Sequence, residues 1–253
     1  MQKVLKQAIK ILKLLLLFWN LSCHFVLAQQ VKNINAINNQ RNIDFNCILQ
    51  DKNGLIWFGT DKGLIKFDGE KYKVFDNVKG LLKSPIKAIY LDQNNVLWIG
   101  HINGKVTLFK EDKFSAFAEN DHLGQNPISS FLENNGIWIG TYGDGVYRYN
   151  GPKKLVHFNV ENGMADNTVY SLCLDKNNSI WAATDGGLTQ FNIKQSKVDL
   201  EIISMKKGLP DNIVRNITVA SNGELLIAMQ DSGICVYNLQ SNSFKTCSNW
   251  KYG

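Results

Sequence analysis

The sequence has little of what metal centres and nucleic-acid-binding surfaces require. It contains five cysteines and four histidines in 253 residues, and the spacing of the cysteines matches no zinc-binding motif. The formal net charge of +6 falls to +2 without the four lysines nearest the N-terminus, because 24 basic residues then face 22 acidic ones. Lysine and aspartate are interspersed, whereas nucleic-acid binding needs a basic stripe. We therefore expect no metal, no cofactor and no nucleic-acid partner.

The motifs of common enzyme classes are also missing. The sequence contains no Ser-His-Asp arrangement, no HExxH and no phosphate-binding loop. Aspartates do recur in the turns of several segments, and paired carboxylates can serve acid–base chemistry. Turn formation explains them better, because aspartate favours hairpin positions before glycine. We therefore predict that this chain has no catalytic residue. These aspartates are Asp61, Asp144, Asp185 and Asp231.

No apolar run reaches the length of about 20 residues that a membrane helix needs. Residues 14–27 form a shorter apolar stretch, preceded by four lysines and followed by Ala28, a small residue suited to cleavage. This pattern predicts a cleaved signal peptide over residues 1–28 and a periplasmic or secreted protein. The alternative is an uncleaved N-terminal anchor. Cys23 could carry a lipid, but Asn20 is a poor residue three places before such a cysteine.

The sequence does contain a repeat with a period of about 42 residues. The steps between equivalent positions are 41, 40, 43 and 45 residues. A period of roughly 40–45 residues built from short strands is typical of a propeller blade, which is one four-stranded sheet. The predicted fold is therefore all-β, a β-propeller of four-stranded blades. The anchor positions are Trp57, Trp98, Trp138, Trp181 and Leu226. The units cover residues 43–78, 85–118, 127–161, 167–205 and 212–250 of a propeller region 43–253, after a leader at 29–42.

Two further positions of the repeat are restricted to small residues, each for a physical reason. The second residue after each anchor is always glycine or alanine, which predicts that a neighbouring blade approaches closely there. A glycine six or seven residues after the anchor, usually behind polar residues, predicts a tight hairpin turn with positive φ. The anchor tryptophans are expected to pack one blade against the next as core residues. The small residues are Gly59, Gly100, Gly140, Ala183 and Ala228.

The connectors between units repeat as well, and they carry a resemblance. The stretch Gly208-Leu209-Pro210-Asp211-Asn212-Ile213-Val214, followed by Arg215 and Ile217, and the stretch Ile56 to Leu64 resemble the two-component regulator propeller repeat. The resemblance covers residues from about 43 to 250. It implies the extracytoplasmic sensor region of a hybrid histidine kinase or related regulator, with a glycan or glycan fragment as ligand. Many members of that family carry two seven-bladed propellers, a small β-sandwich, a membrane helix and a kinase.

Five units are visible in this chain, which predicts either a five-bladed ring or part of an incomplete seven-bladed ring. The sequence shows no phosphoacceptor-histidine region and no ATP-binding segment. Kinase activity is therefore expected in a C-terminal part outside this chain. The leading hypothesis is an extracytoplasmic ligand-sensing module of a two-component system, with a membrane sensor kinase or further propeller blades as partners. The alternatives are a secreted propeller enzyme acting on polysaccharide and a protein-binding scaffold.

Candidate ligand-binding residues follow from position in a propeller. The loops between second and third strands should share one rim with the inter-blade connectors, around the central channel. Residues there that break the repeat are the better candidates, although each could be an ordinary exposed loop residue. His101 stands where other units have threonine, Tyr142 occupies a polar turn position, and His122 replaces a connector glycine. The full set is His101, Tyr142, His122, Asp144, Asp185, Lys62 and Gln230.

Two cysteines of the fifth unit fall on successive predicted strands. Cys235 and Cys247 could form a disulfide across the hairpin, given an oxidising compartment. A shift of the register by one residue would place them on opposite faces. The alternative is two buried thiols.

Overall fold

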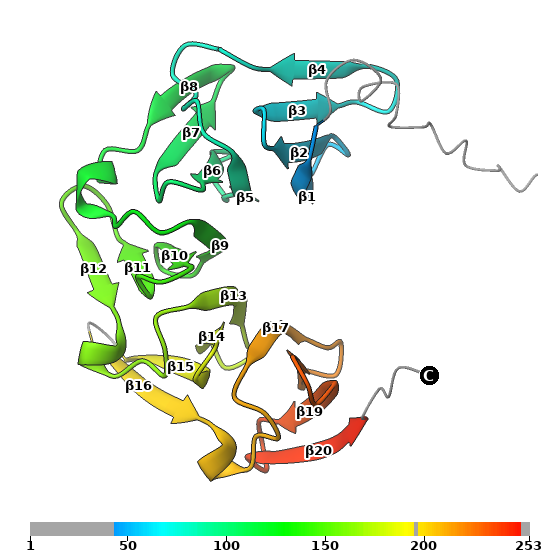
Figure 1. Ribbon diagram of the computed structural model, residues 1–253, viewed down its shortest axis with the longest axis vertical. Helices are drawn as coiled ribbons and strands as arrows, with labels where there is room; N and C mark the ends of the chain where they lie inside the picture. The colour runs from blue at the N-terminus through cyan, green and yellow to red at the C-terminus, as the bar shows by residue number, and fades with distance from the viewer. Residues whose placement is uncertain (1–42, 195–196, 249–253) are drawn as a thin grey trace, which may run out of the picture. The chain divides into compact units, whose positions relative to one another are not determined.

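The computed structural model of the protein describes residues 43–194 and 197–248, which form five four-stranded antiparallel sheets (Figure 1). In every sheet the strands lie side by side in chain order. Blade 1 contains β1 (Phe45–Gln50), β2 (Ile56–Thr60), β3 (Leu64–Phe67) and β4 (Tyr72–Phe75). Blade 2 contains β5 (Ile86–Leu91), β6 (Leu97–His101), β7 (Val106–Lys110) and β8 (Lys113–Ala116). Blade 3 contains β9 (Ile128–Glu133), β10 (Ile137–Thr141), β11 (Val146–Tyr149) and β12 (Leu155–Phe158).

The last two blades follow the same plan. Blade 4 contains β13 (Val169–Leu174), β14 (Ile180–Thr184), β15 (Gly187–Lys194) and β16 (Lys197–Ile203). Blade 5 contains β17 (Val214–Val219), β18 (Leu225–Met229), β19 (Ile234–Asn238) and β20 (Ser243–Ser248). The predicted all-β propeller fold is confirmed. Single-turn helices lie in three of the connectors, η1 (Asn120–His122), η2 (Val160–Asn162) and η3 (Met205–Lys207).

The predictions for the N-terminus fall outside the described residues. The signal peptide at 1–28, the leader at 29–42 and the alternative of a lipid on Cys23 all concern the part that the structure does not describe. Within the described residues, no helix has both the length and the apolar character needed to cross a membrane.

The anchor tryptophans are buried between blades, as predicted. Their side chains are 0–5% exposed, and most of them also close a turn within their own blade. In blade 4, Trp181 donates its indole N–H to Asp175 Oδ2 at 2.9 Å. The other oxygen of Asp175 accepts the backbone N–H groups of Asn177 and Ser179 at 2.8 and 2.9 Å. Trp57 with Asp51 and Trp98 with Asp92 repeat this bond, so one aspartate orders the turn and also satisfies the buried indole.

The small residue after each anchor lies where the next blade approaches. A Cβ atom on Gly100 would lie 2.5 Å from Ile128 Cγ2 of blade 3, and one on Gly59 would lie 2.5 Å from Ile86 Cγ2 of blade 2. The predicted close approach is confirmed. Buried side chains of consecutive blades therefore form joint clusters, as Trp181 of blade 4 does with Ile217 and Tyr237 of blade 5.

Consecutive blades pack through their first strands, β1 with β5, β5 with β9, β9 with β13 and β13 with β17 (Figure 1). Within the described residues, the first and fifth blades do not pack against each other in this way. The difference is visible at one pair of equivalent positions. Ile89 of blade 2 packs against the core shared with blade 1, whereas Ile48 of blade 1 is 67% exposed. A closed five-bladed ring is therefore not the arrangement of these blades, and the incomplete seven-bladed ring stays a prediction.

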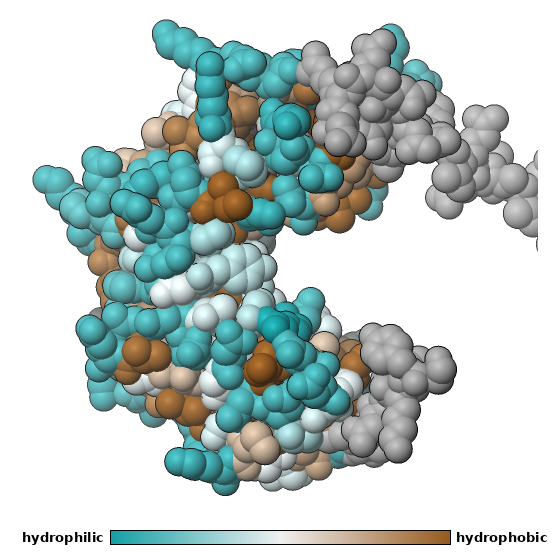
Figure 2. Space-filling view, viewed as in Figure 1, coloured by the Kyte–Doolittle hydropathy of each residue, from teal (hydrophilic) through white to brown (hydrophobic). Residues whose placement is uncertain are grey.

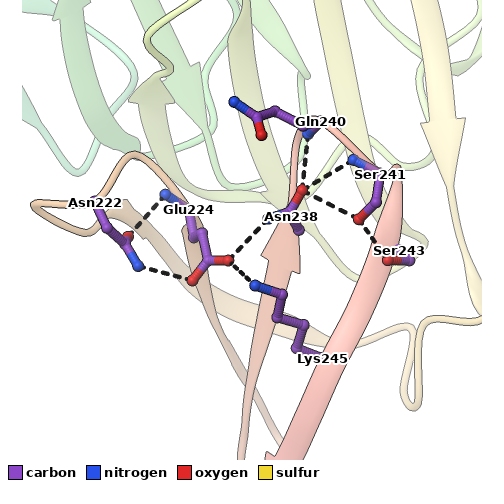
Figure 3. A network of polar contacts seen from close by, with 7 residues as sticks. All are labelled: Asn222, Glu224, Asn238, Gln240, Ser241, Ser243 and Lys245. Carbon is purple, nitrogen blue, oxygen red and sulfur yellow. Dashed lines mark hydrogen bonds and ion pairs between the residues drawn. The ribbon is translucent and has the colours of Figure 1, made fainter.

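The apolar side chains are concentrated between the sheets. The face shown in Figure 2 is mostly hydrophilic with scattered hydrophobic groups. Blade 5 also has a polar network at one end (Figure 3). There the Glu224 carboxylate accepts hydrogen bonds from Lys245, Asn238 and Asn222 at 2.5, 2.9 and 2.8 Å. These bonds to the charged form, the one from Lys245 first, lower the pKa of Glu224 to about 2. The network ties β20 to the turn before β18.

Candidate functional site

Each first strand carries a β-bulge near its N-terminal end. In blade 4 the register shifts between Val169 and Ser171, so Tyr170 lacks a partner residue on β14. In blade 5 the register shifts between Val214 and Asn216, so Arg215 lacks a partner residue on β18. A bulge bends the strand and re-aims the side chain of the extra residue, and bulges are frequent next to functional sites. The equivalent residues of blades 1 to 3 are Asn46, Lys87 and Ser129.

Bulged residues of neighbouring blades contact each other between blades 1 and 2 and between blades 4 and 5. Lys87 Nζ donates to Asn46 Oδ1 at 3.1 Å between blades 1 and 2. Between blades 4 and 5, the Arg215 guanidinium lies over the Tyr170 ring, 4.3 Å from its centroid. A stack of this kind is attractive because the ring face is electron-rich. The bulges therefore line up side chains from separate blades along one edge.

The loops after the second strands lie at this same edge, beside the connectors. Tyr142 donates its backbone N–H to Pro127 O, and Gln230 donates its own to Ile213 O, both at 2.9 Å. Ile102 does the same with Pro85 O at 2.9 Å. The predicted rim, shared by these loops and the connectors, is confirmed.

Five side chains from blades 3, 4 and 5 meet on this rim. We call Tyr142, Tyr170, Asp185, Arg215 and Gln230 the rim cluster. The Tyr142 and Tyr170 rings contact edge to face with their centroids 5.6 Å apart. Tyr170 donates its hydroxyl to Asp185 Oδ1 at 2.8 Å, and Arg215 Nη1 lies 3.7 Å from the same oxygen. Arg215 Nη2 donates to Gln230 Oε1. The cluster is thus one connected set of contacts across three blades.

The rim cluster remains accessible to a ligand. Tyr142 is 40% exposed, and the side chains of Arg215 and Asp185 are 43% and 37% exposed. Burial raises the pKa of Tyr170, and its bond to Asp185 adds to this, while Arg215 opposes it. The hydroxyl therefore stays protonated near neutral pH and keeps donating to Asp185. The surface combines an aromatic edge, a fixed guanidinium, a carboxylate and an amide.

His101 is not on the accessible surface. It is 0% exposed, and both ring nitrogens have partners 2.9 Å away, Nδ1 at Ser84 O and Nε2 at Thr107 Oγ1. Because a carbonyl only accepts, the proton lies on Nδ1, and Nε2 accepts from the threonine hydroxyl. Burial lowers the pKa of His101. The threonines at this position in other blades close the turn, as Thr141 does by donating to Gly145 O at 2.8 Å. His101 instead ties the connector to β7.

The other predicted residues lie apart from the rim cluster. Asp144 holds a connector in place, accepting from Asn126 Nδ2 at 2.9 Å and from its backbone N–H at 3.1 Å. Lys62 belongs to blade 1 and pairs with its neighbour Asp61 at 3.1 Å. His122 ends η1, with its ring 72% exposed and 3.9 Å from Glu119 Oε2. Of the seven predicted residues, the structure therefore brings together Tyr142, Asp185 and Gln230.

Sequence reasoning missed Tyr170 and Arg215, although the repeat contains a signal for them. Both directly follow the first apolar residue of the inner strand, where the other units have Asn46, Lys87 and Ser129. The preceding position is apolar in every unit, whereas this one changes its chemical type from blade to blade. A bulge at a position of such variety points to a shared exposed edge rather than to the core.

The cysteines have two different environments. Cys235 is disulfide-bonded, and the register places Cys247 directly opposite it on β20. The Cys235–Cys247 pair stays a prediction that this register agrees with. Cys47 and Cys173 are free thiols, and burial raises the pKa of each to about 11. They are therefore protonated and unreactive near neutral pH. The described residues contain no cluster of side chains that could hold a metal ion.

Comparison with known proteins places this geometry in a family. Residues 39–62, 122–143 and 163–186 match the family described as two component regulator propeller. The chain therefore contains two-component regulator propeller repeats. It is 30% identical over 178 residues to a protein described as histidine kinase P4 from Formosa agariphila, an alignment that covers 63% of this chain and 13% of that protein.

Solved structures show the same fold. The extracellular domain of a putative hybrid two-component system from B. thetaiotaomicron superposes with a TM-score of 0.69 at 22% identity, covering 82% of this chain and 28% of that one. A virginiamycin B lyase from Staphylococcus aureus superposes with a TM-score of 0.59 at 13% identity, covering 78% and 67%. At these identities the likeness shows the fold alone. The chain spans about an eighth of the histidine kinase and about a quarter of the two-component system domain.

The rim cluster lies partly within the repeats that match the family. Tyr142, Tyr170 and Asp185 fall in matched segments, whereas Arg215 and Gln230 lie beyond the last one. The copies of the two-component regulator propeller repeat therefore share their strands and loops, but they differ in the residues at the bulges and turns.

Proposed function

We propose that this chain is the extracytoplasmic ligand-sensing part of a two-component system and that it binds a glycan at the rim cluster. The observation that supports the proposal most directly is the contact of Tyr142, Tyr170, Arg215 and Asp185 at an accessible edge of three blades. The output would pass to a membrane sensor kinase, in keeping with the similarity to extracellular domains of such systems.

The chemistry of the cluster suits a sugar. A pyranose ring offers an apolar face for an aromatic side chain and hydroxyl groups that both donate and accept. Arg215 and Gln230 supply donors, and Asp185 supplies an acceptor with one carboxylate oxygen, Oδ2, outside the bonds described above. The existing contacts fix these groups before a ligand arrives, which lowers the entropy cost of binding.

A binding assay with the full chain tests this proposal. We expect saturable binding of at least one oligosaccharide in a panel of plant and algal polysaccharide fragments, measured by calorimetry, and no release of product over hours. Arg215→Ala should weaken that binding about tenfold or more, because it removes the stacked cation and the donor to Gln230. Lys62→Ala is the matched control, since it removes an exposed rim cation outside the cluster, and should leave binding unchanged.

Three results would contradict the proposal. Steady turnover of a polysaccharide would favour the alternative of a secreted propeller enzyme. Binding that is equally strong in Arg215→Ala would exclude the rim cluster as its site. A chain that binds no glycan but captures another protein through the rim would favour the scaffold alternative.

A further inference from the structure

An accessible cleft lies between blades 4 and 5, away from the rim cluster. This cleft has a volume of about 620 Å³, within the range of roughly 300–1,000 Å³ found for ligand pockets. It is reached from the turn before β14, whereas Asp185 of the rim cluster follows the other end of that strand. The cleft and the rim cluster are therefore separate sites at opposite ends of blade 4.

The third and fourth strands of blade 4 form one wall of the cleft. They span eight and seven residues, against four to six in the other blades. Register places Trp181, Gln190 and Glu201 opposite one another across β14, β15 and β16, so all three side chains lie on one face of the sheet. That face is turned toward blade 5, because the Trp181 ring meets the Tyr237 ring at 6.0 Å.

Two polar groups in the cleft lack partners. Tyr237 is 5% exposed and lines the cleft, and its hydroxyl makes no hydrogen bond to any described residue. The half-buried amide of Gln190 is also without one in this part of the chain. Neither group is among the fully buried, unpaired side-chain atoms of the described residues, so both reach the space of the cleft. Here the hydroxyl and the amide both face an open cavity, where a ligand can pair with them.

Few charged side chains line the cleft. Lys207 pairs with Glu201 at 2.7 Å, and Lys194 shares Asp199 with Lys197, at 3.3 and 2.7 Å. The remaining polar lining consists mainly of amides, Gln190 and Asn192 on β15 with Asn177 and Asn242 on nearby turns. Amides donate and accept at once, as sugar hydroxyls do. Both lysines of the lining already contact a carboxylate, and amides predominate, so the lining favours a neutral ligand.

We infer that the cleft between blades 4 and 5 is a second binding site, for a neutral oligosaccharide. The hydroxyl groups of the sugar pair with the Tyr237 hydroxyl and the Gln190 amide. The amides on the nearby turns bind the other sugar hydroxyls. This site does not depend on the proposed function of the rim cluster, because the two sites share no residue.

The repeat itself suggests variants that should fold. Gln190→Leu places in blade 4 the residue that blade 2 has at the same position, Leu108, opposite its own tryptophan. Tyr237→Phe removes only a hydroxyl that has no partner among the described residues. Both variants should unfold at the temperature of the unaltered chain, which circular dichroism can verify.

Binding is then measured by calorimetry with cellotriose, xylotriose, laminaritriose and mannotriose as neutral probes and trigalacturonate as the charged comparison. We expect at least one neutral trisaccharide to bind more tightly than trigalacturonate. Each variant should weaken that binding about five- to tenfold, the effect of losing one hydrogen bond, and Arg215→Ala should leave it unchanged.

The inference is overturned if none of the four neutral probes binds, or if both variants bind as the unaltered chain does. Binding lost only in Arg215→Ala would also overturn it, while supporting the rim site. Loss in the cleft variants together with unchanged binding in Arg215→Ala would support the cleft and leave the proposed function to its own test.

Discussion

Replacing Gly100 with alanine would insert one methyl group where two blades meet. The added Cβ would lie 2.5 and 2.6 Å from two atoms of Ile128 and 3.0 Å from Phe131 Cε2, about 1 Å short of an ordinary carbon–carbon contact. Ile128 is 0% exposed and packs within a cluster of buried side chains, so moving it would displace other core residues. The backbone of blade 3 would have to shift away from blade 2.

The expected loss of stability follows from two opposing effects. Overpacking of a well-packed core costs about 1–3 kcal/mol, and two close contacts with one immobile side chain favour the upper value. Replacing glycine in a strand returns about 0.5–1 kcal/mol of chain entropy. The net loss is about 2 kcal/mol, which for a chain of this size lowers the unfolding midpoint by about 4–8 °C.

Thermal unfolding followed by circular dichroism measures this shift. Ser115→Ala, on the exposed face of β8 in the same blade, is the control and should change stability by less than about 0.5 kcal/mol. Ala183→Gly tests the same position in blade 4. The methyl group of Ala183 is fully buried there, so removing it should also destabilise the fold. A midpoint for Gly100→Ala equal to or above that of the unaltered chain would refute the account of inter-blade packing.

Three further predictions concern ionisable and unpaired groups. Because the pKa of Glu224 is lowered in the folded chain, its network stabilises the fold above about pH 4.5. This stabilisation is lost as the pH falls toward 2. In urea unfolding, the free energy of unfolding should therefore fall less over this pH range in Glu224→Gln than in the unaltered chain. The lowered pKa of His101 means that the unfolded chain protonates first, so stability should fall below about pH 6.5, and a pH-independent midpoint between pH 7 and 5 would contradict its burial as a neutral ring. Ser130 has a buried hydroxyl without a partner, so Ser130→Ala should be neutral or stabilising by up to about 1 kcal/mol; a loss above that size would show that the hydroxyl is paired.

The blade could be predicted because its determinants are local and repeated. The tryptophan, the small residue two places later and the turn glycine fall within about ten residues, and each acts through strand or turn geometry that neighbours in sequence fix. Five copies in phase made the signal strong. The burial of Trp181 and the close approach at Gly100 follow directly from this pattern.

The candidate site depended on contacts that no single blade contains. Tyr170 and Arg215 lie 45 positions apart and meet only because two bulged strands pack side by side. His101 occupies a position expected on the rim, yet Thr107 and the connector enclose it. Likewise, the cleft beside Gln190 is lined by residues of blade 4 together with Tyr237, Leu239 and Asn242 of blade 5. The sequence by itself determined the repeat, the strands and the core of this protein, because these depend on periodic local patterns. Only the tertiary structure decided which side chains share an edge, because that depends on how neighbouring blades pack.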